Sequence, residues 1–268
     1  MNSAGFLQLV GITDWPAFVL VSARVAGLFL MAPLWSHTGL PRNIRSGAAV
    51  VLSAALVPAV TPVAPLPDDM LASSLVLGAE TLLGIAIGLS GALLIAGMTV
   101  AGEIASLQMG LSLGEAYGSL PAGTTVGIGQ LKNYFALLVY LSLNGHLVLY
   151  EGLAASLRAV PPGQALAGLA GGLPVATVAG SIFSTGVRAA APILVALLLT
   201  NLALAILGKA VPQLNVMMLS FPVTMSVGLL AFGASLPFLA SLVAGEVEAL
   251  PLRVGETIRA FTPAALPR

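Results

Sequence analysis

Serine and histidine are the side chains here with the potential for nucleophilic chemistry, and two serines stand in patterns known from hydrolases. The run GLSLG at 110–114 has the spacing of the GxSxG nucleophile elbow, and GLSG at 88–91 has that of rhomboid-type intramembrane proteases. The elbow requires a strand before the serine and a helix after it. Ser112 instead follows an expected helix and precedes an expected coil, which argues against Ser112 as a nucleophile.

Ser90 is the stronger of the two serines because a base could come within reach of it. Measured from the loop that joins their expected helices, Ser90 and His146 lie at similar depths, roughly 18 and 21 Å. Glycine and serine also pack membrane helices against one another, and 84–88 beside Ser90 is a GxxxG face. No acidic residue is placed to orient His146. The sequence therefore favours a protein that is not an enzyme, and an intramembrane protease remains the alternative.

The composition is that of a chain surrounded by lipid or by other subunits. Of 268 residues, 58 % are apolar and 7 % are charged, and mean hydropathy is +1.03. Soluble domains carry about 25 % charged residues, so there is too little charge here to cover a surface facing water. The ten basic and ten acidic residues cancel, which argues against nucleic acid as a partner.

Metal and redox chemistry have little to build on. The chain has no cysteine, and therefore no disulfide or thiolate site, and only two histidines. His146 has no second histidine or carboxylate at ligand spacing. We predict no catalytic, cofactor or metal site, and we read residues 1–13 as lacking the basic and small-residue features of a cleaved signal peptide.

The elements that must position these residues are expected to be helices that cross a membrane. A crossing helix needs about 20 mostly apolar residues. About six apolar segments approach or exceed this length. The segments are 16–35, 46–60, 71–102, 133–150, 175–207 and 216–245. The sequence thus predicts an all-α integral membrane protein forming one membrane domain over 1–268, with a short polar tail at 246–268.

Three charged residues fall inside these segments. Arg24, Glu80 and Arg188 would each cost about 2.5–3.5 kcal/mol at the centre of a membrane helix. Prolines within the segments also leave backbone carbonyls without donors, which lipid cannot satisfy. Both features favour helices that pack within a protein assembly. A secondary transporter, with its charges gathered around one midplane site, remains a second alternative.

The stretch 103–149 interrupts the apolar pattern. It holds carboxylates, amides, a lysine, a histidine and a glycine-rich loop at 111–129, whose only charge is Glu115. Linkers are usually more charged and less apolar than this loop, which includes Leu113 and Tyr117. Asn144 and His146 end the following apolar segment, where a hydrogen-bonded helix end explains them better than ligand binding.

Seven short runs resemble, in order and spacing, the FliR family of the flagellar export gate. They cover nearly the whole chain, and the NGHL run is closer to the flagellar branch than to the related injectisome proteins. The runs are ARVAGLFLMAP (23–33), IR (44–45), GEI (102–104), QMGLS (108–112), NGHL (144–147), PQLNV (212–216) and FP (221–222).

This resemblance implies a subunit of a helical, pore-forming assembly built from long, bent helical hairpins. The expected partners are FliP-type and FliQ-type subunits, an FlhB-type switch protein on the cytoplasmic side, and the exported unfolded flagellar proteins. The expected place is the bacterial inner membrane at the flagellar basal body. The loop at 111–129 would plug or gate the pore.

The resemblance and the sequence pattern together single out two groups of residues. The residues expected to form the plug or gating loop are Met109, Gly110, Leu111, Ser112, Leu113, Gly114, Tyr117, Gly118, Pro121 and Gly123. The polar residues expected to be buried and to hold the assembly are Arg24, Glu80, Glu103, Gln108, Lys132, Asn144, His146, Arg188, Lys209, Gln213 and Asn215.

Overall fold

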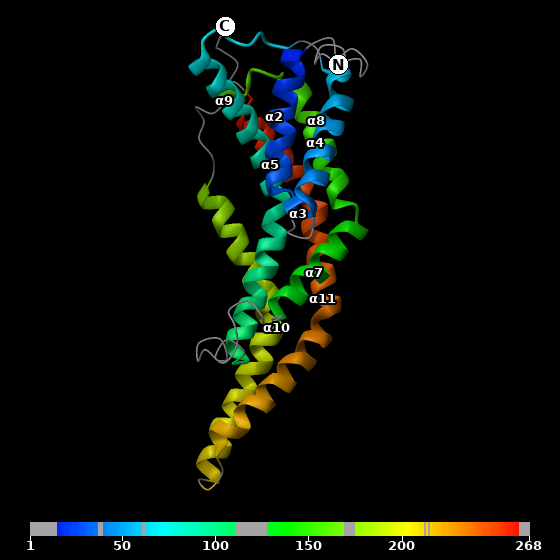
Figure 1. Cartoon of the computed structure of the whole chain (residues 1–268). Coiled ribbons are helices and arrows are strands. Elements are labelled where there is room, and N and C mark those ends of the chain that lie inside the picture. Colours follow the sequence, from blue (N-terminus) through cyan, green and yellow to red (C-terminus); the bar gives the residue numbers. More distant parts are fainter. Residues whose placement is uncertain are drawn as a thin grey trace. The chain divides into compact units, whose positions relative to one another are not determined.

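The computed structural model confirms the all-α prediction: every regular element that it describes is a helix (Figure 1). The residues that it describes are 15–36, 40–60, 63–110, 128–168, 175–211, 213 and 215–262. The elements are α2 (Trp15–Met31), α3 (Pro33–Ser36), α4 (Arg42–Leu56), the 3-10 turn η1 (Val57–Ala59), α5 (Met70–Gln108), α7 (Ile128–Ser142), α8 (Gly145–Ala159), α9 (Ala165–Gly168), α10 (Val175–Ala210) and α11 (Val216–Ala260).

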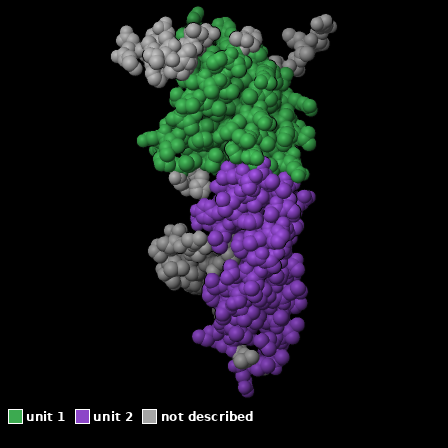
Figure 2. Space-filling model, turned by 90° about the vertical axis from the view of Figure 1, so that its right-hand side faces the viewer, with its two compact units in different colours: residues 1–92, 144–175, 247–268 green, residues 93–143, 176–246 purple. Residues whose placement is uncertain are grey.

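The chain divides into two compact units, coloured separately in Figure 2. Unit 1 comprises 1–92, 144–175 and 247–268, and unit 2 comprises 93–143 and 176–246. The long helices α5 and α11 each supply residues to both units.

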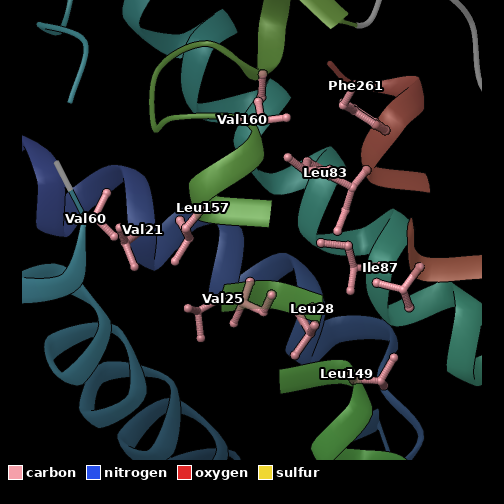
Figure 3. Packing of buried hydrophobic residues seen from close by; sticks show 14 of the residues in the cluster. Val21, Val25, Leu28, Val60, Leu83, Ile87, Leu149, Leu157, Val160 and Phe261 are labelled. Carbon is pink, nitrogen blue, oxygen red and sulfur yellow. The ribbon is translucent and has the colours of Figure 1, made fainter. Parts of the chain in front are cut away.

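Unit 1 is built around an apolar core to which α2, α5, α8 and α11 contribute (Figure 3). On α2 the apolar residues recur at three- and four-residue intervals, which places them along one side of the helix. The buried apolar residues of α5 and α8 recur at the same intervals. The buried members labelled in Figure 3 are Val21, Val25, Leu28, Val60, Leu83, Ile87, Leu149, Leu157, Val160 and Phe261.

Glycines bring α2 and α5 into backbone contact. A Cβ atom added to Gly27 would strike the carbonyl oxygen of Thr81, and one added to Gly84 would strike that of Arg24. Gly88 lies in the same way against the carbonyl of Leu28, 2.7 Å from the position that its Cβ would take. The glycines of the 84–88 motif are therefore helix-packing residues, as small residues are in membrane helices generally.

Unit 2 holds a smaller core and the more exposed apolar helices. Ala105 of α5 and Met109, which follows this helix, pack with Ile193 and Leu197 of α10. The Met109 side chain fills the space beside Gly228 of α11. The apolar window of each of the candidate spans from α10 and α11 is only 22 % buried, compared with 56 % for that of α5. These two helices therefore leave most of their apolar surface for a neighbour or for lipid.

Among the described residues, three helical stretches are long and apolar enough to cross a membrane: Met70–Gln108, Phe183–Ala210 and Met218–Ala260. The pair Gln130–Ser142 and Gly145–Ala159 makes a fourth if it is counted as one broken span. Of the remaining expected segments, the first forms the shorter apolar helix α2, with 17 residues, and the second forms α4, with 15.

Two expected helix boundaries differ from the structure. The segment 133–150, expected as one helix, is two, because Asn144 adopts the left-handed conformation with φ 57°. Conversely, the polar tail from residue 246 continues α11 as far as Ala260. At 45 residues α11 is longer than α5, at 39, and it includes Pro222, Pro237 and Pro251.

Candidate functional site

The most buried charges among the described residues form an ion pair in unit 1. Arg24 on α2 and Glu80 on α5 are both 0 % exposed, and Arg24 Nη2 lies 2.6 Å from Glu80 Oε2. Arg24 Nε donates a second bond to the same oxygen at 2.7 Å. The sequence placed both charges inside apolar segments without giving their partners, and the structure pairs them with each other.

The remaining polar atoms of this pair are bonded to α8 and to the turn that follows it. Arg24 donates from Nη1 to Ser156 Oγ at 3.2 Å and from Nη2 to the carbonyl of Val160 at 3.0 Å. Glu80 Oε1 accepts the backbone N–H of Gly163 at 2.9 Å. A buried ion pair is tolerated when such additional bonds satisfy it. The network therefore ties α2, α5 and α8 together and leaves no open polar site.

Lys132 on α7 is buried within the described part of unit 2. Its side chain is 1 % exposed, and Nζ donates to the carbonyl of Ala189 on α10 at 3.1 Å. Pro192 lacks the N–H that would serve the carbonyl of Arg188, so the helix is short of a donor in this turn. Lys132 donates to the next carbonyl, that of Ala189, and thereby links α7 to α10 in this turn.

Ser90 and His146 have different neighbours in the structure. Ser90 Oγ donates to the carbonyl of Ala86 at 3.2 Å and lies 3.4 Å from Thr257 Oγ1. The His146 ring instead lies edge-on to Tyr150, at a centroid distance of 6.2 Å. The Tyr150 hydroxyl accepts a bond of 2.6 Å from Trp35 Nε1, so this part of unit 1 is an aromatic cluster.

The expected plug residues fall mainly outside the part of the chain that the structure describes. Met109 is buried in unit 2, and Gly110 follows α5 with φ 76°. The other members lie beyond the described residues: Leu111, Ser112, Leu113, Gly114, Tyr117, Gly118, Pro121 and Gly123.

Residues 15–250 match the family model described as Bacterial export proteins, family 1. The chain belongs to this family. It is 28 % identical to flagellar biosynthetic protein FliR of Escherichia coli K12 over 263 residues, covering 94 % of this chain and 98 % of that protein. Identity to the FliR proteins of Pectobacterium carotovorum and Bacillus subtilis is 30 %, over 89 % and 80 % of this chain and 89 % and 83 % of theirs.

In this family 1 export protein, seven of the polar residues expected to be buried are exposed in the chain by itself. They lie on outward helix faces or in turns, where no other described part of the chain packs over their side chains. These residues are Glu103, Gln108, Asn144, Arg188, Lys209, Gln213 and Asn215. Asn215 has a local role, because its Oδ1 accepts the backbone N–H of Met218 in the first turn of α11 at 3.2 Å. Across the described residues no three histidine or acidic side chains gather as a metal site.

Sequence reasoning missed the partners of the buried ion pair and the tyrosine–tryptophan bond. The sequence did not predict Ser156 and Gly163 as partners, because a serine in a helix and a glycine in a turn are common and carry no specific signal. The run Pro161-Pro162-Gly163 was the available signal, since such a turn exposes a backbone N–H that a buried carboxylate can bind. Trp35 and Tyr150 are 115 residues apart, and no local pattern links them.

Proposed function

We propose that this protein is a subunit of the flagellar type III protein export gate and helps to form the pore through which unfolded flagellar proteins cross the inner membrane. The observation that carries the proposal is the match to the export family over residues 15–250, together with relatives named FliR that align over most of their own length. Its role is in flagellum assembly, and its place is the flagellar basal body.

The exposed apolar helices support an assembly. Most of the apolar surface of the candidate spans from α10 and α11 is uncovered in the chain by itself, and exposed apolar surface on this scale is typical of interaction sites. We propose FliP-type and FliQ-type subunits as the neighbours and an FlhB-type switch protein on the cytoplasmic side. The exported flagellar proteins are the proposed cargo.

The alternative functions lack a site among the described residues. A secondary transporter needs charges that can exchange a bound ion or substrate, whereas Arg24 and Glu80 satisfy each other and Lys132 serves a carbonyl. An intramembrane protease needs a base at Ser90, whose hydroxyl is engaged with Ala86 and lies next to Thr257. No observation favours either alternative.

Deletion of the gene in the bacterium that carries it tests the proposal. We expect loss of swimming and of flagellar filament protein in the medium, both restored by the intact gene. Affinity purification of a tagged chain from native membrane, with identification of the subunits that accompany it, provides the biochemical arm. Normal motility in the deletion strain, or a tagged chain recovered without FliP-type and FliQ-type subunits, would contradict the proposal.

A further inference from the structure

The charges within the long helices divide into those that the chain satisfies itself and those that it presents outward. Arg24, Glu80 and Lys132 are buried and hydrogen-bonded within their own unit. Glu103, in contrast, is exposed although it lies inside Met70–Gln108, a stretch apolar enough to cross a membrane. Among the described residues, no hydrogen bond or ion pair uses this carboxylate.

Glu103 stands on the side of α5 that faces away from the core of unit 2. Ala101 and Ala105, two residues before and after it, are both 0 % exposed. Since two residues correspond to about 200° around an α-helix, Glu103 points in the opposite direction. Leu107, one turn further on, is 64 % exposed on the same side. The outward side of this part of α5 therefore exposes the Glu103 carboxylate beside the apolar Leu107, with the uncharged Gln108 next to them.

The basic residues described in unit 2 leave Glu103 without an ion pair. Lys132 is buried and donates to the carbonyl of Ala189. Arg188 and Lys209 are exposed, and Arg24 pairs with Glu80 in unit 1. A carboxylate facing lipid would be costly, whereas a basic group on a neighbouring subunit would satisfy it.

We propose that the Glu103 carboxylate binds a lysine or arginine side chain on a helix of a neighbouring subunit. This inference rests on the proposed export-gate function and adds to it the chemistry of one contact. The negative charge of Glu103 favours a basic partner group. The exposed Leu107 beside it favours an apolar helix as the element on which that basic group lies. A partner helix without a basic group would leave the carboxylate buried and unpaired. One desolvated ion pair would therefore determine which helix docks here and in which register.

The test compares four variants of the tagged chain, co-expressed with the other gate subunits and purified as a complex. E103Q removes the charge at nearly the same shape, E103L makes the face wholly apolar, E103D keeps the charge, and E256Q removes an exposed carboxylate near the end of α11. We expect E103Q and E103L to lower the yield of complex at least about tenfold. E103D should retain most of the yield, and E256Q should match the unaltered chain.

The chain purified alone provides the control for folding. Because Glu103 bonds nothing within the described chain, E103L should unfold thermally at the same temperature as the unaltered protein. Selection for restored motility in an E103K strain should then yield changes of a lysine or arginine to an acidic residue in a different subunit.

Three results would contradict the proposed contact. They are an unchanged yield for E103Q, a yield for E103L equal to or above that of the unaltered chain, and suppressors of E103K confined to this chain. A carboxylate facing lipid would give the second result, because leucine suits lipid better. Failure of the proposed function looks different, since the unaltered chain would then purify without the gate subunits.

Discussion

At the scale of single residues, the chain shows how a charge is kept inside an apolar protein. Arg24 is bonded to a carboxylate, a hydroxyl and a carbonyl, and Glu80 also accepts a backbone N–H. Removing one partner of such a pair leaves an uncompensated buried charge, whereas replacing both with apolar groups can be nearly neutral. The two kinds of substitution therefore have different expected outcomes.

Glu80→Ala should lower the stability of the protein in detergent by about 3–5 kcal/mol, because the Arg24 guanidinium loses its counter-ion while it remains buried. Thermal unfolding and the amount of protein recovered from the membrane measure this loss. The double variant Arg24→Met with Glu80→Leu should recover most of the stability. If Glu80→Ala unfolds at the same temperature as the unaltered protein, the ion pair does not stabilise the fold.

Ser90→Ala should leave motility and flagellar export unchanged. Its hydroxyl bonds a carbonyl of its own helix and lies next to the hydroxyl of Thr257, and the loss of such a hydroxyl typically costs only about 0.5–1.5 kcal/mol. Swimming speed and secreted filament protein, at matched membrane levels, provide the measurement. Loss of export with normal levels of protein would revive the protease alternative.

At the scale of elements, the crossing of α2 with α5 depends on the absence of side chains. Gly27 and Gly84 lie directly against backbone carbonyls of the opposing helix, so the two helices approach more closely than any larger residue permits. This crossing also brings Arg24 and Glu80 together. Local packing and the polar network therefore depend on each other.

Gly84→Ala should destabilise the protein by about 1–3 kcal/mol, because the added methyl group would push α2 away from α5. Gly78→Ala is a matched control in the same helix: nothing lies within 4 Å of the added Cβ. There the higher helix propensity of alanine should stabilise by up to about 1 kcal/mol. Thermal unfolding of both variants gives the comparison, and a Gly84→Ala protein as stable as Gly78→Ala would contradict the close crossing.

The elements also show how far sequence patterns reach. Apolar run length predicted α2, α5, α10 and most of α11, because burial in an apolar surrounding requires continuous apolar residues. It failed at Asn144, where one left-handed residue divides the helix expected over 133–150. Asparagine tolerates this conformation better than most residues, and the following Gly145 was the only local signal. Of the candidate site, the sequence identified Arg24 and Glu80 as buried charges. It could not give their pairing, since 56 residues separate them.

At the scale of the whole molecule, the charged residues within the helices fall into two groups, and for assembly this division matters more than the number of charges. Charges bonded within a unit serve its fold, whereas Glu103 and Arg188 face outward from the helices of unit 2. The sequence predicted all of them as buried in the assembly. It could not separate the two groups, because periodicity in an almost uniformly apolar helix does not show which side packs inside the subunit.

The loop at 111–129 remains the predicted closure element of the pore. A loop with few charges and many glycines can fill a lumen without burying charge and can move aside at low conformational cost. Removal of 114–123 should keep the gate assembled but raise the leakage of ions or small molecules in cells that express it. A deletion complex that assembles normally and leaks no more than the intact one would make the loop a connector.

The ion pair between Arg24 and Glu80 imposes an order of events during synthesis. Glu80 leaves the ribosome 56 residues after Arg24, and Val160 leaves it 136 residues after. At 5–20 residues per second, the arginine waits roughly 3–11 s for its counter-ion and roughly 7–27 s for the carbonyl. During that interval α2 is a nascent helix with an unpaired charge on the side that will be buried, so it cannot insert stably by itself. A chain arrested before Glu80 should therefore be extracted from the membrane more readily than one arrested beyond Gly163, since only the longer chain holds every member of the network.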